Sequence, residues 1–209
     1  MRLIKASALK LFSERGFDAT TTKQIADEAG VAHGTVFLVA PTKDSLLVTV
    51  LEDELGTVMT GLAVSMPRRS VEAQIRHVCD GLFDFHARRP DLSRVFMKAV
   101  MFFSDPIAKA QYEAHVSAFV RYLATLFDKA KSRGELVART NTAAAAENTV
   151  ALYIHLLVSF LNESDPDREA LEARFRAGLS LLFHGLAPAG SVPDRGRGRR
   201  LTSASGRSP

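Results

Sequence analysis

The sequence predicts an all-α protein of about nine helices, in which an N-terminal three-helix head is joined by a long fourth helix to a larger helical bundle. Three observations support this fold class. Apolar residues recur at helical spacing along almost every informative segment. Capping residues, glycines and prolines separate these segments. No stretch alternates polar and apolar residues over the length of a strand, so a sheet is not expected.

Composition narrows the class of protein. The chain has 209 residues, of which 46% are hydrophobic and 24% charged, so it can bury a sizeable core. Cys79 is the single cysteine, which excludes an intrachain disulfide and fits a reducing compartment. The N-terminus is amphipathic and charged, unlike a signal peptide, and the stretch 148–162 without formal charge is shorter than the ~18–20 residues that span a bilayer. We therefore expect a cytoplasmic protein with no membrane segment.

The net charge of +4 comes from the C-terminal tail. Five arginines and one aspartate lie in residues 188–209, and they account for the whole of it. This tail has too few apolar residues to fold, so it is predicted to be disordered. It is interpreted as a passive solubilising end, with nonspecific attraction to nucleic-acid phosphates as the alternative. Net charge therefore says little about the folded residues.

The first three helices are short. Ile4, Ala8, Leu11 and Phe12 form one apolar stripe on a helix that should stop near Gly16. The spacing of a threonine at 21 and a glutamine at 24 is a capping-box pattern that opens a second helix, which continues to position 29. A third is expected over residues 33–39, because the proline that follows at 41 bars its continuation.

The remaining helices are longer and have clear start and stop signals. Thr42 can cap the fourth, Asp105 followed by a proline starts the seventh, and Gly134 stops it. Asp165, also followed by a proline, is expected to open the ninth. The expected ranges are about 43–63, 70–89, 90–103, 105–133, 141–161 and 165–185.

Seven positions within 18 residues match the packing needs of a helix-turn-helix. Its second and third helices cross steeply, so particular positions must be small or apolar and the turn must tolerate a positive φ. These positions hold Ile25, Ala26, Ala29, Gly30, Val31, Val36 and Val39. The alternative is an ordinary helical hairpin whose turn contains a glycine.

The segment ALKLFSERGFDATTTKQIADEAGVAHGT, followed by TKDSLL, lies between Ala8 and Leu47 and resembles the TetR family of bacterial transcriptional regulators. Downstream, the chain is similar to that family only in the number and length of its helices, including RGEL at residues 133–136. The resemblance implies a DNA-binding domain over residues 1–47 and a ligand-binding and dimerisation domain over residues 48–187.

The resemblance also implies which residues contact DNA. Those at the start of the second helix would touch phosphates, since helix N-termini suit anions. Those of the third helix would look into the major groove, where histidine and threonine can contact base edges. A lysine at the start of helix four would bind a phosphate group of the DNA. The matching residues are Thr21, Thr22, Lys23, His33, Gly34, Thr35, Phe37 and Lys43.

The position of Lys43 indicates a phosphate contact even apart from the family resemblance. A cation in the first turn of a helix is opposed by the helix dipole by ~0.3–1 kcal/mol. This placement is explained if the amine and the helix end hold one phosphate together. The alternative is a solvated surface lysine.

Two residues depart from the family pattern. Phe37 lacks the hydroxyl of the tyrosine common there, which removes a phosphate hydrogen bond worth about 0.5–1.5 kcal/mol. Ala40 replaces the usual phenylalanine, so the small core of the head loses volume. The chain also begins almost at helix one, so either the basic arm of many relatives is dispensable or the true start lies upstream.

Helices five to seven are rich in phenylalanine, and the family places its ligand pocket between helices four and eight. The resemblance thus implies an apolar, aromatic-lined pocket for a small apolar effector such as an acyl chain or an aromatic molecule. The candidate lining residues are Phe83, Phe96, Phe102, Phe103, Phe119 and His155. The alternative is that the rings fill a core and that the histidine is a satisfied core residue.

Other reactive side chains favour structural interpretations. His77, Asp80 and Asp84 share one helix face, which could cradle a divalent metal, but a solvated polar face is favoured and no metal site is predicted. Cys79 is not favoured as a redox switch, because only His77 is near enough in sequence to lower its pKa. No cofactor is expected.

Helices eight and nine resemble the pair that forms a four-helix interface with a twofold mate. Their apolar residues are Val150, Ile154, Leu157, Val158 and Leu161 on helix eight, and Leu171, Phe175, Gly178, Leu179, Leu182 and Leu186 on helix nine. A twofold homodimer would place two recognition helices on successive major grooves of a palindromic site. The alternative is that both helices are internal core.

Taken together, the resemblance implies a ligand-responsive regulator. A homodimer would occupy a palindromic operator on double-stranded DNA, at the nucleoid, and leave when a small molecule binds. Repression is the expected output, although an activator would use the same parts. The remaining alternative is a helical ligand-binding or protein-interaction module with degraded DNA binding. An enzyme is not expected, because the sequence has no H-E-x-x-H, no phosphate-binding G-x-x-x-x-G-K and no nucleophile elbow.

Overall fold

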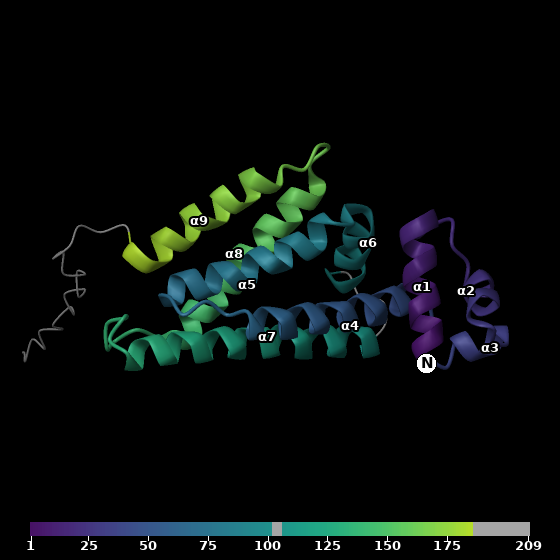
Figure 1. The fold of residues 1–209 in the computed structure, drawn as a ribbon, viewed down its shortest axis with the longest axis horizontal. Helices are drawn as coiled ribbons and strands as arrows, with labels where there is room; N and C mark the ends of the chain where they lie inside the picture. The colour runs from purple at the N-terminus through teal and green to yellow at the C-terminus, as the bar shows by residue number, and fades with distance from the viewer. Residues whose placement is uncertain (102–105, 186–209) are drawn as a thin grey trace, which may run out of the picture.

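The computed structural model describes residues 1–101 and 106–185, and within them it contains nine helices and no strand (Figure 1). The all-α prediction is therefore confirmed. The helices are α1 (Arg2–Arg15), α2 (Thr22–Ala29), α3 (His33–Val36), α4 (Lys43–Val64), α5 (Val71–Ala87), α6 (Pro90–Met101), α7 (Pro106–Ser132), α8 (Thr142–Asn162) and α9 (Arg168–His184). The Arg-rich tail, at 188–209, lies outside the described residues.

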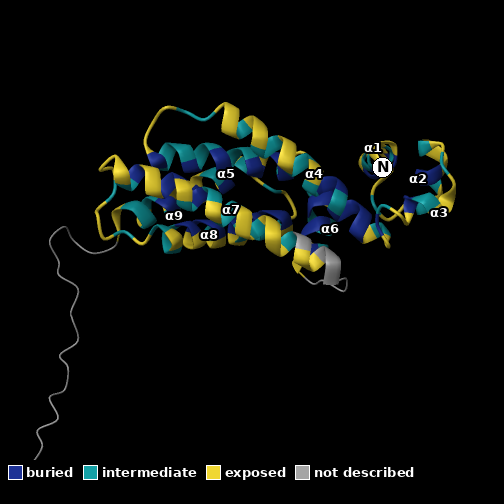
Figure 2. Cartoon of the chain, turned by 90° about the horizontal axis from the view of Figure 1, so that it is seen from below, coloured by how far each residue is buried: buried dark blue, intermediate teal, exposed yellow. Residues whose placement is uncertain are grey.

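The helices form a small head and a larger body. Figure 1 shows α1, α2 and α3 together at one end, with α4 running from them into the bundle of α5 to α9. The 22 residues of α4 span about 33 Å at 1.5 Å per residue. Its first half is buried and its far end is exposed, as Figure 2 shows. This helix therefore joins the cores of the two parts.

Side-chain caps begin four of the described helices where the sequence predicts them. Thr21 forms a capping box with Gln24, and Thr42 forms one with Ser45, so each pair satisfies two orphan backbone N–H groups. Ser70 and Asn141 cap α5 and α8 in the simpler way, with one side-chain oxygen each. These caps set the register in which each apolar face meets the core.

Two predicted boundaries are wrong. The third helix ends at Val36 rather than near position 39, because the backbone N–H groups of the next residues bond three residues back in tight turns before Pro41. The ninth helix begins at Arg168, not at Asp165. Asp167 is its cap, with Oδ1 accepting from the N–H groups of positions 169 and 170 at 2.8 and 3.0 Å.

The centre of the body is aromatic. Phe83 of α5 packs against Tyr153 of α8 and Phe175 of α9, with ring centroids 4.9 and 5.4 Å apart. Phe83 and Phe175 are fully buried. These rings join three helices that are distant in sequence, so they define the middle of the bundle.

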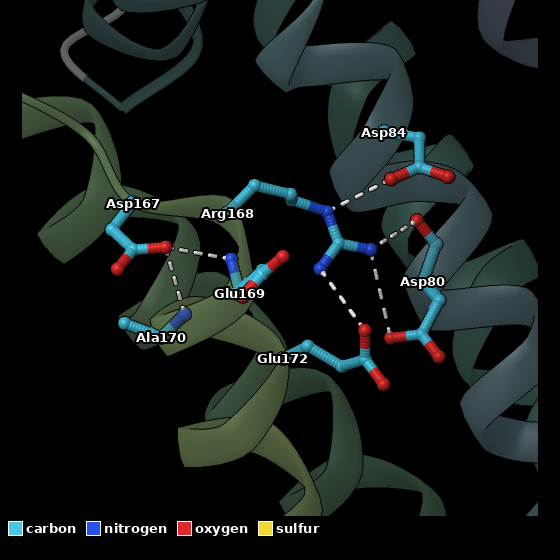
Figure 3. Close-up of polar contacts among 7 residues, drawn as sticks. All are labelled: Asp80, Asp84, Asp167, Arg168, Glu169, Ala170 and Glu172. Atoms are coloured by element: carbon cyan, nitrogen blue, oxygen red, sulfur yellow. Dashed lines mark hydrogen bonds and ion pairs between the residues drawn. The ribbon is translucent and has the colours of Figure 1, made fainter.

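Arg168 fastens the start of α9 to α5 (Figure 3). Its Nε donates to Asp84 Oδ1 at 2.8 Å, and its Nη2 donates to the backbone oxygen of Asp80 at 3.1 Å. The Asp80 carboxylate and Glu172 lie within ion-pair distance of the same guanidinium. Burial, and then the neighbouring Glu172, raise the pKa of Asp80. The solvated face expected for Asp80 and Asp84 is therefore an interhelical ion-pair cluster.

Helix α8 is long and apolar enough to cross a membrane by length and composition alone. Eight of its residues are nevertheless buried against the rest of the chain. The core helix of a globular bundle passes the same test. Its hydrophobicity is thus accounted for by its contacts with α6, α7 and α9.

Replacing Phe175 with alanine should lower the free energy of unfolding by about 3–5 kcal/mol, since the lost ring leaves a cavity between α5 and α9. Chemical denaturation at a fixed protomer concentration measures this change. The control is Asp128→Ala at an exposed position of α7, which should change stability by no more than about 0.5 kcal/mol. Equal effects of the two substitutions would contradict the central role of Phe175.

Candidate nucleic-acid interface and effector cavity

The helix-turn-helix packs as its sequence spacing predicts. Ile25, Ala26 and Val36 are buried at the crossing of α2 and α3. Gly30 ends α2 in the left-handed conformation, with φ +66°, and its N–H bonds back to α2. Val31 then donates to the carbonyl of Ala26 at 3.0 Å, which closes the turn. The ordinary-hairpin alternative is excluded by this geometry, and α3 is held with one face free.

The free face of α3 carries residues expected to read bases. His33 is exposed, and its Nε2 lies 3.0 Å from the hydroxyl of Thr22 at the start of α2. The ring of Phe37 meets the His33 ring edge to face at 5.2 Å and is 45% exposed. Gly34 is exposed as well, whereas Thr35 is half-buried. The turn thus presents one connected surface formed by two helices.

The phosphate side of this surface is the beginning of α2. Thr21 and Lys23 are exposed there. The hydroxyl of Thr21 is engaged in the capping box, while Lys23 extends from the first turn. A helix N-terminus with exposed donors favours an anion. The DNA contacts of these residues remain predictions.

Lys43 occupies an unexpected position. Its Nζ donates to the carbonyl oxygens of Phe17 and Thr20 at 2.9 and 3.1 Å, and it lies 4.2 Å from the centroid of the Phe17 ring. The lysine is half-buried, so the solvated-lysine alternative is wrong. It anchors the loop between α1 and α2 to the start of α4. An ammonium has three donors, so this arrangement leaves one for another acceptor.

A cavity of about 340 Å³ lies in the body between α4, α5, α6, α7 and α8. Its walls are mostly aliphatic and aromatic, with few polar groups. The lining residues are Glu52, Leu55, Gly56, Met59, Leu82, His86, Phe96, Met97, Tyr112, His115, Val116, Ala118, Phe119, Tyr122, Val150, Tyr153, Ile154 and Leu157. This is the small end of the size range typical of ligand pockets.

The predicted lining residues divide into three groups. Phe96 and Phe119 line the cavity. Phe83 does not line the cavity, because its ring packs against Tyr153 and Phe175 in the aromatic centre of the body. Phe102 and Phe103 lie outside the described residues.

The third group is His155 alone, for which the sequence predicts a place either in the pocket or in the core. Both predictions are wrong, because His155 lies on the exposed face of α8. The residues of that helix that line the cavity, such as Ile154 and Leu157, point the other way. Packing against α7 and α9 decides which side of the helix is covered.

The sequence reasoning misses one acid and two histidines of the cavity, which are Glu52, its partner His115, and His86. The side chain of Glu52, on α4, is only 10% exposed, and Oε1 lies 3.1 Å from Nδ1 of His115 on α7. Burial raises the pKa of the Glu52 carboxyl, although His115 opposes the shift. In sequence, Glu52 is the first of three consecutive acids and has the appearance of a solvated face. Only the packing of α7 against α4 distinguishes it.

His86 is the third missed residue. It is 2% exposed, and burial lowers its pKa to about 4, so it is neutral at physiological pH. The Ser93 hydroxyl donates to the His86 carbonyl at 3.1 Å, so it must accept the bond from His86 Nδ1, also at 3.1 Å. Nδ1 therefore carries the proton, and Nε2 is an acceptor.

Three consecutive acids of α4 connect the cavity to the head. Glu52 meets α7 at the cavity, Asp53 binds Lys5 of α1 at 2.6 Å, and Glu54 pairs with Arg89 in the corner between α5 and α6. Arg89 also donates to the hydroxyl of Ser13 on α1 at 3.3 Å. One turn of helix thus contacts the cavity, the DNA-binding head and the body.

Cys79 is fully buried, and burial raises the pKa of its thiol well above the usual range. This agrees with the sequence-based view that it is not a redox switch. Among the described residues, no group of three or more His, Cys, Asp and Glu side chains could hold a metal ion.

The apolar residues expected to form a dimer interface mostly face inward. Val150, Leu157 and Leu161 of α8 are buried in the chain's own core, as are Phe175 and Leu179 of α9. For these residues, the internal-core alternative is correct. Position 186 lies outside the described residues.

The outer face of α9 carries a different stripe. It consists of exposed Ala170, Ala173, Ala177 and Leu181. Their spacing of three or four residues places them on one side of the helix. Leu181 is 54% exposed.

These features define an all-α helix-turn-helix protein with a ligand-sized cavity in its body. Residues 4–50 match the family model described as bacterial regulatory proteins, tetR family. The chain is 26% identical over 201 residues to the uncharacterized HTH-type transcriptional regulator YerO of Bacillus subtilis, with 92% of this chain and 67% of that protein covered. Residues 4–50 therefore form an N-terminal domain of the tetR-family type.

Other similarities cover different parts of the chain. The nucleoid occlusion factor SlmA of Haemophilus influenzae is 27% identical over 110 residues, which cover 52% of this chain and about half (49%) of SlmA. The fold is shared with FadR of Thermus thermophilus, a repressor solved in complex with lauroyl-CoA. That superposition has a TM-score of 0.73 at 23% identity and covers 94% of this chain and 99% of FadR.

The buried neutral His86 should make stability depend on pH. Its pKa is about 4 in the folded protein and 6.5 ordinarily, so the unfolded chain takes up the proton first. Stability should therefore fall as the pH drops from about 6.5 toward 4, by about 2–3 kcal/mol at pH 4.5. Glutamine cannot titrate. Denaturation curves of His86→Gln should therefore show a free energy of unfolding that does not fall by this amount at low pH. The control His184→Gln, at an exposed position, should follow the wild type.

Proposed function

We propose that this protein is a ligand-responsive transcription regulator, a homodimer that binds a palindromic operator at the nucleoid and is released by a small apolar effector. Residues 1–47 form the DNA-binding domain and residues 48–187 the ligand-binding and dimerisation domain. The observation that carries the proposal is the helix-turn-helix, whose exposed face is formed by His33 and Gly34 of α3 and by Phe37 directly after it. The apolar cavity in the body supports the effector half.

Two sets of contacts would hold the operator. The start of α2, with Thr21, Thr22 and Lys23, offers backbone and side-chain donors to one phosphate group. His33 and Thr35 of α3 would contact base edges in the major groove. The bond between Thr22 and His33 fixes the imidazole, so phosphate binding and base reading are coupled.

Release would operate through α4. A ligand in the cavity contacts α4 near Glu52, and the next two acids of that helix are bonded to Lys5 and to Arg89. A rotation of α4 that the ligand favours would move the head relative to its twofold mate and change the spacing of the two recognition helices. The ligand must prefer the spread state for this shift to occur. Repression follows if the operator overlaps a promoter.

Fluorescence anisotropy with DNA upstream of the gene tests operator binding. The full chain should bind this duplex more tightly than a scrambled one, and its affinity should fall as salt rises. Lys43→Met should weaken binding and reduce the slope of log affinity against log salt by about 1. The variant removes the ammonium, whose third donor would otherwise bind a DNA phosphate. Lys129→Met, at an exposed position of α7, is the control and should leave both unchanged.

Two other results would point elsewhere. If Lys43→Met lowers thermal stability but leaves the salt slope unchanged, Lys43 only anchors the loop between α1 and α2. Equal affinity for upstream and scrambled DNA at low salt, also in a chain extended at its N-terminus, would favour a ligand-binding module with degraded DNA binding.

The proposed dimer would form through the outer faces of α8 and α9. The alanines on α9 allow close approach of a second copy, and Leu181 and the exposed Ala151 of α8 add apolar surface. Ala177→Glu would place two carboxylates close together across the twofold axis, where they repel each other and lose solvent. It should therefore convert the dimer to a monomer in light scattering and weaken operator binding by about ten-fold or more.

The matched control for this prediction is Ala63→Glu. It adds the same charge at an exposed position on the far end of α4. This variant should remain dimeric. A monomeric wild-type protein, or a dimeric Ala177→Glu variant, would contradict the interface through α9.

A further inference from the structure

The effector cavity has one distinctive polar feature, the carboxylate of Glu52. Among the described residues that line the cavity there is one acid and there is no lysine or arginine. Glu52 is nine-tenths buried, so its charge is poorly solvated by water. A carboxylate in such a place gains from a cationic partner.

The partner that the described residues supply is His115. Its ring lies at the rim of the cavity, with 61% of its side chain exposed, and it reaches Glu52 at 3.1 Å. An imidazole is a cation only when it is protonated. An alkylammonium keeps its charge throughout the physiological pH range and is therefore the stronger partner for a carboxylate.

Aromatic rings surround the same space. Phe96, Phe119, Tyr112, Tyr122 and Tyr153 all line the cavity. The faces of aromatic rings attract cations. The apolar walls would hold a hydrocarbon chain, and the rings and Glu52 would hold its charged end.

A second polar group of the cavity, the imidazole of His86, also favours a donor. Nε2 of His86 is an acceptor, because Nδ1 carries the proton of this neutral ring. The carboxylate and the imidazole nitrogen both accept hydrogen bonds. An anionic head group would meet Glu52 with like charge, and the described part of the cavity wall offers it no lysine or arginine.

We infer that the effector is a small apolar molecule with a cationic amine head, which pairs with Glu52 in place of His115. This inference rests on the proposed function for the idea that the cavity is the effector site. It differs from what FadR of Thermus thermophilus binds, since lauroyl-CoA carries anionic phosphates.

Isothermal titration of the full chain, without DNA, tests the inference with five ten-carbon probes below their micelle concentrations. They are decylamine, decyltrimethylammonium, decanol, decanoate and decanoyl-CoA, so the apolar chain is constant and the head group varies. Both cations should bind at least ten-fold more tightly than decanol, and decanoate should bind more weakly than decanol. Tighter binding of decanoate or decanoyl-CoA than of decylamine, or no binding of any probe, would overturn the inference.

The variant Glu52→Gln keeps the size and hydrogen bonding of the side chain but removes its charge. It should weaken both cations at least ten-fold and change decanol by less than two-fold. The control Glu14→Gln makes the same charge change at an exposed position of α1, outside the cavity, and should leave all affinities unchanged. Thermal unfolding of both variants establishes that they are folded. Unchanged decylamine affinity in folded Glu52→Gln would overturn the inference.

Operator release is measured separately, by adding each probe to the DNA complex. Cations that bind through Glu52 but leave the operator occupied would support the inferred ligand class and contradict the proposed regulatory function. Decanoyl-CoA that binds most tightly and releases the operator would support regulation and overturn the inferred class.

Discussion

The continuous burial of α4 at the junction of head and body is the constraint that organises the whole molecule. Leu46, Leu47, Val48, Val50 and Leu51 are all buried within six residues, so the helix is surrounded on every side there. It contacts α1 in the head and α5 and α6 in the body. Because packed interiors deform little, a movement of this turn relative to the body must be accommodated by the head. The functional surfaces at its two ends are therefore mechanically connected.

Polar contacts fix the angle of this junction. The loop between α1 and α2 is anchored by Lys43, and the outer side of α1 is held by Asp53 and Arg89 through Lys5 and Ser13. Exposed ion pairs contribute little stability, about 0–1 kcal/mol each. These contacts instead fix the orientation of α1 relative to α4, since each one joins elements that are distant in sequence. A helix held by a few weak polar contacts can change its angle without unfolding the apolar packing.

The body has two distinct interiors. One is solid, with Phe83, Tyr153 and Phe175 in ring contact and Arg168 closing the gap to α5. The other is the cavity between α4 and α7, where the side chains leave space. The solid part gives α8 and α9 a fixed shape, as a dimer interface requires. The hollow part lies against α4, so a ligand bound there would contact the helix that enters the head.

Local signals in the sequence were sufficient to predict the helices, the turn and the head. Capping at Thr21 and Thr42 and the positive φ of Gly30 depend on neighbours within a few residues, so spacing alone indicates them. Which face of each helix lies inside depended on packing. Contacts between distant segments turned His155 outward, committed Phe83 to the solid core and buried Glu52 beside α7. Helical periodicity identifies an apolar side, but the partner across it is set by residues far apart in the chain.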